Sequence, residues 1–429
     1  MRVTLTALVD KSNILTLLAL SATVMIWSTD PLVVWGYEIA VFALAGWECF
    51  RLLRTPTPAF PPVLAPMVAI SLWGFLQLAM GATVYRWATV NAALQNMALA
   101  ATAMGAFLVL RRPEIRAAFL RAIGCRVGPA IAIVGVLAYW TSPGKILWIY
   151  PSVYPDNWGL FPSRNNFAQF VELCLPIALF ETMRNGKSWT ASAAPAAILG
   201  AGLASASRAG AVLLLCETAA VLGLVLRGSS EKWRLRMGLR RGLRTPLLAF
   251  AGGSVAFAAW AGAGTLVHRL ADHDPLQFRR EIFHSTMAMI AQRPWLGYGL
   301  GTYSTVYPEF AEFDAGASVE HAHNDWLEWT AEGGIFYAAM WASIAIWAAR
   351  PALRSVWGLG ILAVFLHALA DYPFARLGVS AWAFLLIGAL AREAQRVRRA
   401  PPDELGTASR RTPFCASSSK AENTPASSY

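Results

Sequence analysis

The sequence is poor in charged residues. Of its 429 residues only 14% are charged, 56% are hydrophobic, and the mean hydropathy is +0.45. In a soluble globular domain roughly a quarter of the residues are charged, so the scarcity argues against that class. Apolar runs separated by short charged clusters instead indicate a protein that crosses a membrane many times. Such spans are helices, because a backbone in lipid must satisfy its own hydrogen bonds.

Cysteine is also scarce, and a single basic face is missing. No cysteine falls in a segment expected on the outer side of the membrane, so no disulfide is expected there. The net charge of +11 comes from arginines placed between apolar runs, so a nucleic-acid partner is not expected. No internal repeat is visible, which weakens a transporter built from inverted repeats. The five cysteines are Cys49, Cys125, Cys174, Cys216 and Cys415.

The apolar runs predict an all-α polytopic membrane protein with about twelve transmembrane helices. We expect a transmembrane domain over residues 1–395, in which a long periplasmic loop, residues 268–325, joins the ninth and tenth helices. Residues 396–429 are basic and then rich in Ser, Pro and Ala, which predicts a disordered cytoplasmic tail. The expected spans are Ile14–Trp27, Leu32–Phe50, Val63–Ala79, Ala88–Leu110, Val127–Trp140, Phe167–Met183, Thr190–Ser205, Ala209–Leu226, Pro246–Val267, Trp326–Ala349, Val356–Ala370 and Leu377–Ala391.

Lysine and arginine predict which side each loop faces. With the N-terminus inside, roughly three quarters of these cations fall in the inside segments, as the positive-inside rule requires. Both termini are then cytoplasmic, and the long loop faces outward. The flank of the first span, "WSTDPL", lacks a small-residue cleavage site, so we expect an uncleaved helix rather than a signal peptide.

Arg208, in the outward turn "SASRAG", interrupts a run that is otherwise uncharged from Thr190 to Cys216. One interpretation is an arginine that snorkels, with its stem in lipid and its head in water. The other is an anion site beside the membrane, because a guanidinium is permanently charged and its planar fork matches phosphate oxygens.

The long loop contains an expected amphipathic helix, which Pro294 and the glycines of "GYGLG" should end. Arg279 and Arg280 lie off its apolar face, so either they touch lipid headgroups or one of them joins Arg208 around an anionic ligand. No strand precedes "GYGLG", which excludes a nucleotide-binding loop. The expected apolar positions are Phe278, Ile282, Thr286, Met289 and Ile290.

The stretch "EHAHNDWLE" places His321 and His323 at the outer mouth of an apolar segment. Near neutral pH an imidazole can take a proton from a sugar hydroxyl and give it back. Asn324 or Asp325 is expected to cap the following helix. A zinc site would need a clear third ligand, which the sequence does not offer. Glu332, one turn into the helix, either orients a histidine or contacts a neighbouring helix.

Four segments together resemble the O-antigen ligase and polymerase superfamily. They are "SRNNFAQF", "SASRAG", "PWLGYGLG" and "HAHNDWLEWTAEGG", in the family's order. The resemblance implies a glycosyltransferase of the bacterial inner membrane with its active site facing the periplasm. Its donor would be a glycan on undecaprenyl pyrophosphate, and its acceptor lipid A-core or another glycan, with no metal, nucleotide or other cofactor.

Matching the family's motifs residue by residue implies site residues in this chain. His323 would be the central catalytic histidine, and His321 a less constant second one. Arg208 would bind the pyrophosphate together with Arg279 or Arg280, between which the motif does not decide. We expect three supporting residues in the same segments: Asn324, Glu332 and Arg164.

The favoured function is O-antigen ligation to lipid A-core in lipopolysaccharide assembly, because the tail is short and no added outer domain is expected. A polymerase of O-antigen or exopolysaccharide is the nearest alternative. A small-anion transporter is an alternative of a different class, which Glu38, Glu172 and Glu217 within expected spans would favour.

Overall fold

The computed structural model describes most of the chain. The described residues are 11–26, 31–53, 59–152, 157–185, 189–227, 244–271, 279–313, 316 and 318–399. Phe278, Cys415 and most of the expected C-terminal tail therefore lie outside the described residues. Within them the chain is mostly helical, and the only paired strands form one short hairpin, so the all-α prediction is confirmed.

The first layer of the bundle joins the N-terminal helices to the last helix. α17 packs against both α4 and α1, and it does so closely, since a Cβ on Gly388 would lie 2.2 Å from the backbone oxygen of Ala103. Small residues let helices approach in this way where lipid gives no hydrophobic drive for association. The helices are α1 (Lys11–Val24), α2 (Pro31–Leu52), α3 (Leu64–Ala79), α4 (Arg86–Val109) and α17 (Leu377–Arg399).

A second layer contains the middle of the chain, and α7 lies at its centre. α7 contacts α8, α9 and α16, and its side chains are buried along most of its length. The helices are α5 (Pro113–Ala122), η2 (Ile123–Val127), α6 (Gly128–Thr141), α7 (Arg164–Asn185), η3 (Trp189–Ser192), α8 (Ala193–Ala204), α9 (Arg208–Arg227), α11 (Arg244–Trp260) and α12 (Gly264–Leu270). The hairpin strands are β1 (Lys145–Ile146) and β2 (Tyr150–Pro151).

The remaining helices follow the long loop. α13 (Arg279–Gln292) buries Ile282, Thr286 and Met289, as the expected amphipathic pattern requires. Gly334, inside α15, has φ 73° and ψ 179°, so this helix is kinked in its first half. The other elements are α14 (Tyr303–Val306), η4 (Tyr307–Glu309), α15 (Asp325–Ser355) and α16 (Leu359–His367).

Several expected spans differ from the observed helices, and the one over Val356–Ala370 contains only the nine-residue α16. The span expected to begin at Val127 begins at Pro113, because the π-helical turn η2 joins α5 to α6 in one apolar stretch of 29 residues. The span expected over Pro246–Val267 is broken, and α11 and α12 meet at 84°. By length and composition, five described helices can cross a membrane, or six with this bent pair as one span. The count of twelve therefore stays a prediction.

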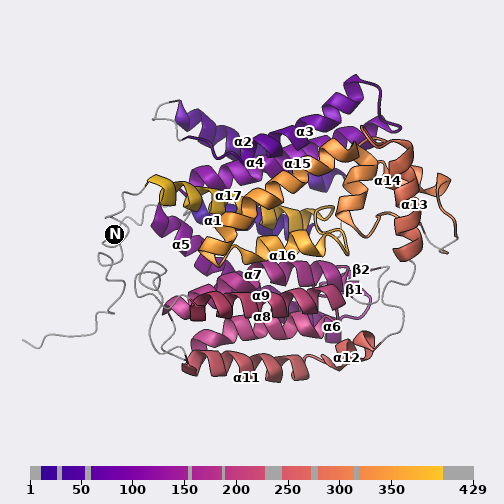
Figure 1. Cartoon of the computed structure of the whole chain (residues 1–429). Helices are drawn as coiled ribbons and strands as arrows, with labels where there is room; N and C mark the ends of the chain where they lie inside the picture. The colour runs from indigo at the N-terminus through magenta and orange to yellow at the C-terminus, as the bar shows by residue number, and fades with distance from the viewer. Residues whose placement is uncertain are drawn as a thin grey trace, which may run out of the picture.

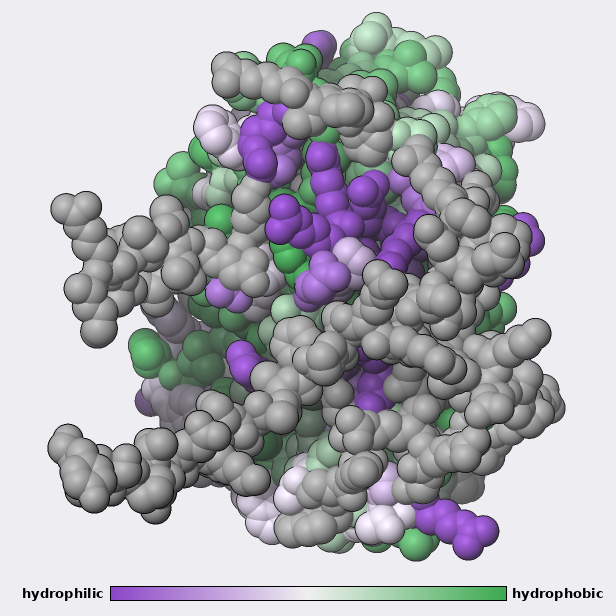
Figure 2. Space-filling model, turned by 90° about the vertical axis from the view of Figure 1, so that its left-hand side faces the viewer, coloured by the Kyte–Doolittle hydropathy of each residue, from purple (hydrophilic) through white to green (hydrophobic). Residues whose placement is uncertain are grey.

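The bundle has two distinct ends. Figure 1 shows α12, α13, α14 and the β1–β2 hairpin together at one end, on the right, which we call the α13 end. α16 runs back toward this end, and α17 leaves from it (Figure 1). Figure 2 looks at the opposite end, where hydrophilic residues gather near the middle of the face. Arg116 of α5 lies 3.5 Å from Glu393 of α17, so a largely buried ion pair joins these two helices.

Candidate active site at the α13 end

The first turn of α15 fixes the position of His323. Asn324 is the N-cap residue, and its side-chain oxygen accepts a hydrogen bond of 3.1 Å from the Leu327 amide. The cap leaves His323 just outside the helix, in the left-handed region at φ 51°. Its side chain is 33% exposed, and its Nδ1 lies 3.1 Å from Oδ1 of Asp371. The imidazole is thus held by a carboxylate while part of it reaches solvent.

Asp371, in the turn between α16 and α17, is the hub of this end. Its Oδ2 accepts a hydrogen bond of 3.0 Å from Gln169 of α7. Nη2 of Arg279 lies 3.8 Å from Oδ1, and Nη1 of Arg279 donates to the Ala370 carbonyl at 2.6 Å. Burial raises the pKa of Asp371, but the bond to His323 and the charge of Arg279 outweigh it and hold the pKa below its ordinary value. Asp371 is therefore a carboxylate at neutral pH.

Backbone hydrogen bonds lock the Asp371 turn onto α15. The amide of Asp325 donates to the carbonyls of Ala368, at 2.9 Å, and Asp371, at 3.2 Å. In return, the Phe374 amide donates to Oδ2 of Asp325 at 2.9 Å. These bonds satisfy polar groups that would otherwise be buried without partners, which is costly. They also set the separation between His323 and Asp371 by the backbone and not by side chains alone.

His321 belongs to a second histidine–carboxylate pair. Its Nδ1 lies 2.9 Å from Glu328, whose other oxygen accepts from the Ala322 amide at 2.8 Å. The Tyr372 ring stacks on His321 with centroids 4.3 Å apart and meets His323 edge-on at 5.0 Å. The guanidinium of Arg376 lies 5.1 Å from the centre of the Tyr372 ring. Both histidines therefore share one aromatic wall.

The glycine connector is a tight turn, as the sequence predicts, and it supports the site from one side. Gly297, Gly299 and Gly301 all have positive φ, and a Cβ on Gly297 would lie 2.3 Å from the Glu332 backbone. The side chain of Glu332 accepts from the Tyr303 amide at 2.9 Å. The two expected roles for Glu332 are orienting a histidine and contacting a neighbouring helix, and the contact observed is with the first residue of α14.

Arg208 lies at the same end, at the first position of α9. Ser207 caps the helix, since its hydroxyl accepts from the Gly210 amide at 3.2 Å. A Cβ on Gly210 would lie 2.5 Å from Ala168, the residue next to Gln169. The start of α9 is thus packed against the part of α7 that binds Asp371. Arg164 is the first residue of α7 and is half-buried.

Sequence reasoning missed Asp371, Gln169 and Tyr372. The turn "DYPFAR" stands out in the sequence as a short outward loop, but no motif gives it a role. Gln169 lies inside the segment "SRNNFAQF", which carries the resemblance, and the geometry alone singles it out. The structure also separates the two loop arginines. Arg279 binds the Asp371 turn, while Arg280 faces outward and is exposed.

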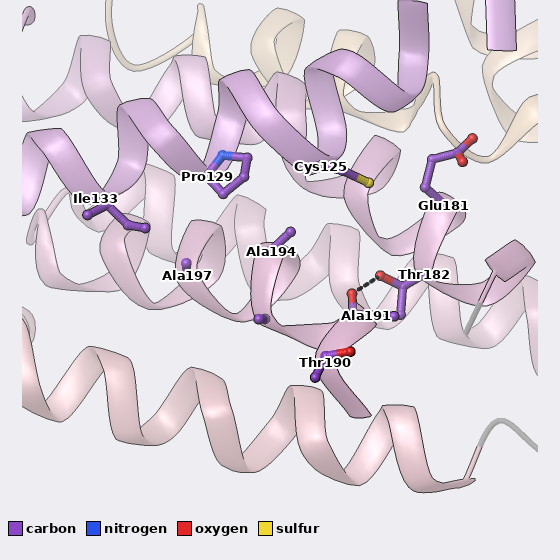
Figure 3. A pocket seen from close by; sticks show the side chains of 10 residues that line it. Cys125, Pro129, Ile133, Glu181, Thr182, Thr190, Ala191, Ala194 and Ala197 are labelled. Carbon is purple, nitrogen blue, oxygen red and sulfur yellow. Dashed lines mark hydrogen bonds between the residues drawn. The ribbon is translucent and has the colours of Figure 1, made fainter. Parts of the chain in front are cut away.

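A cavity of about 380 Å³ lies elsewhere, between η2, α6, the end of α7 and α8 (Figure 3). It is lined by Cys125, Glu181, Thr182 and several alanines, and Thr182 donates to the Ala191 carbonyl at 2.8 Å. Glu181 lies near the C-terminal end of α7, so this cavity is remote from His323. Within the described part of the chain, no group of three or more His, Cys, Asp and Glu side chains is arranged to hold a metal ion.

Comparison with known proteins finds a family for part of the chain. Residues 193–342 match the family model described as O-antigen ligase, which confirms the resemblance found in the sequence motifs and supports an O-antigen ligase-like family. The match contains Arg208, Arg279 and both histidines, but it leaves out Gln169 and Asp371. No curated protein matches the chain.

Proposed function

We propose that this chain is an O-antigen ligase. The match of residues 193–342 supports a membrane glycosyltransferase of the O-antigen ligase or polymerase type. It would move a glycan from undecaprenyl pyrophosphate to a sugar hydroxyl of lipid A-core, at the periplasmic face of the bacterial inner membrane. One observation carries the proposal. The Asp371 carboxylate lies 3.1 Å from the His323 imidazole and 3.8 Å from the Arg279 guanidinium, and the three residues come from distant segments.

His323 is the proposed general base. A carboxylate at Nδ1 favours the tautomer with its proton on Nδ1, so Nε2 carries a lone pair for the acceptor hydroxyl. The hydroxyl oxygen forms a bond to the anomeric carbon, and its proton passes to Nε2. The bond from the anomeric carbon to the pyrophosphate oxygen breaks, and its electron pair stays on the departing pyrophosphate. Such a base contributes about 10²–10⁴-fold to the rate.

The arginines are the proposed partners of the pyrophosphate. Arg279 uses one nitrogen on the Ala370 carbonyl and lies beside Asp371, which fixes the guanidinium in place. A fixed cation stabilises developing negative charge without reorganising during the reaction. Arg208, at the start of α9, would complete the site from the helix that packs against Ala168 of α7. This arrangement favours Arg279 over Arg280 as the loop arginine of the site.

Two alternative functions, a polymerase and a small-anion transporter, make different predictions. A polymerase would use the same residues but take a second lipid-linked glycan as acceptor. A small-anion transporter is favoured by one observation, the buried carboxylates Glu172 and Glu217 in the interior of the bundle. It requires no transfer chemistry at His323.

Reconstitution tests the proposal. Purified protein in liposomes is given lipid-linked glycan, core lipid, or both, and products are separated by gel electrophoresis. A ligase makes glycan-capped core lipid only when both are present. Longer lipid-linked chains from the donor alone would identify a polymerase instead. No product in any arm, together with uptake of a labelled small anion into the liposomes, would establish the transporter.

A further inference from the structure

Glu172 and His367 form a buried hydrogen-bonded contact that the proposed reaction does not use. Nδ1 of His367, on α16, lies 2.7 Å from Oε1 of Glu172, on α7, and the two side chains are 1% and 0% exposed. Their surroundings are mostly apolar side chains of the bundle core. A buried pair of this kind adds little net stability, because desolvation offsets the attraction. Its best-attested use is to fix how two elements pack.

The Glu172–His367 pair is one of two hydrogen bonds that join α7 to the end of α16 and the turn after it. On α7, Gln169 and Glu172 are three residues apart and so share one helix face. On the other side, His367 ends α16, and the amide of Asp371 donates to the His367 carbonyl at 3.0 Å. Gln169 donates a hydrogen bond of 3.0 Å to Asp371, and Glu172 is hydrogen-bonded to His367. Both hydrogen bonds therefore fix the position of the Asp371 carboxylate.

α7 and α16 are in close contact at Glu172. A Cβ on Gly360, at the start of α16, would lie 2.4 Å from the Glu172 carbonyl oxygen. Two helices this close have few alternative registers, because protein interiors are close-packed. The hydrogen bond of His367, at the other end of α16, then selects one of these registers. The reach of Asp371 toward His323 depends on that register.

We propose that the Glu172–His367 hydrogen bond positions Asp371, and through it His323, for glycan transfer. This inference rests on the proposed function and deepens it by adding two positioning residues that touch neither donor nor acceptor. The other charged groups that face the pair are Glu217 of α9, Asp371 and Arg279. The buried carboxyl oxygens of Glu217 make no hydrogen bond to the pair, which makes Glu217 a matched control.

Paired substitutions separate the hydrogen bond from the charge. Glu172→Gln keeps an oxygen that accepts from Nδ1, and Glu172→Leu removes it; His367→Asn keeps a donor near Nδ1, and His367→Phe removes it. We expect Glu172→Leu and His367→Phe to lower kcat about 30-fold or more with the donor KM unchanged, because misplaced groups cost about 10²-fold. Glu172→Gln and His367→Asn should stay within about threefold of the native rate. Glu217→Leu, which removes no hydrogen bond to the pair, should leave kcat within about twofold.

Hydrogen–deuterium exchange supplies a readout that does not need activity. In Glu172→Leu, amides of residues 368–376 should exchange at least about fivefold faster than in Glu172→Gln, since local opening becomes easier. Equal exchange in the two variants, or equal kcat, would overturn the inference. A native chain without transfer activity would instead overturn the proposed function, and the exchange result would still decide the role of the pair.

Discussion

Two buried carboxylates lie toward opposite ends of α7 and have contrasting surroundings. Glu181 pairs with Arg184 at 3.1 Å and Arg121 at 3.6 Å, and Asp371 pairs with His323 at 3.1 Å and Arg279 at 3.8 Å. Gln169, which binds Asp371, and Glu181 are twelve residues apart on α7, or about 18 Å along the helix. Burial and charge pairing are therefore common to both ends of the bundle.

The difference lies in the partners. One of the arginines at Glu181 comes from the same helix, three residues on, and the other from the neighbouring α5. The cavity beside Glu181 is lined by four alanines among ten residues, and no histidine is one of them. Asp371 gathers groups from α7, α13 and the residue just before α15, and one of them is the partly exposed imidazole of His323. The arginines at Glu181 come from α7 itself and from the neighbouring α5. At Asp371, in contrast, distant segments meet around a histidine, as expected of a functional site.

The largest expected effect is at His323. His323→Ala should lower glycan transfer by about 10³-fold or more without preventing membrane insertion, because the general base is lost. The matched control is His284→Ala on α13, where an exposed histidine contacts Glu312 at 3.0 Å. Transfer is measured per folded protein in liposomes. Full ligation by the His323→Ala variant would remove histidine from the mechanism.

The comparison of the two ends predicts a smaller but selective effect at Asp371. Asp371→Asn should lower kcat about 100-fold, since an amide no longer favours the productive imidazole tautomer. Glu181→Gln makes the same change in charge at the opposite end and should leave kcat within about twofold. If both variants lost activity equally, the two carboxylates would not differ in function.

Lysine substitutions test the arginines next. Arg208→Lys and Arg279→Lys should each lower transfer about 10–100-fold, because an ammonium lacks the planar fork that binds two phosphate oxygens. Arg280→Lys is the control and should retain nearly native transfer. Near-normal activity of Arg208→Lys would favour the snorkelling interpretation of that residue.

Gly334→Ala should affect stability more than chemistry. Gly334 has φ 73°, and an added Cβ would lie 2.0 Å from the Trp295 carbonyl oxygen. We expect a loss of about 1–3 kcal/mol, seen as a lower Tm in detergent. Gly36→Ala is the control, since a Cβ there meets nothing within 4 Å. An unchanged Tm for the Gly334→Ala variant would contradict the kink in α15.

The smallest effect is a pH dependence of stability. The pKa of Asp371 lies below its ordinary value of about 4, so its contribution is complete above that pH and is lost as the pH falls through the lowered value. The Tm difference between the native chain and Asp371→Asn should be constant from pH 7 to about 5 and should narrow below about 4. A difference that widened in acid would reverse the assigned direction.

The sequence predicts the all-α class because apolar segments in lipid must be helical, whereas the number of spans stays a prediction. It predicts the Asn324 cap and the glycine turn, because caps and positive φ have local signatures, while the role of His323 stays a prediction. Asp371 has no such signature, since its role depends on Gln169, two hundred residues earlier in the chain, and on packing between α7 and α16. The break between α11 and α12 was missed for a related reason, because an apolar run does not reveal an 84° bend.

The backbone hydrogen bonds between Asp325 and the Asp371 turn have a consequence for chimeric proteins. The segment that matches the family model contains His323 but ends before Asp371. A graft of residues 193–342 into a relative would therefore bring a histidine to a foreign carboxylate and a foreign glutamine. Swaps that aim to change the acceptor should carry α7 and residues 359–377 along with the graft.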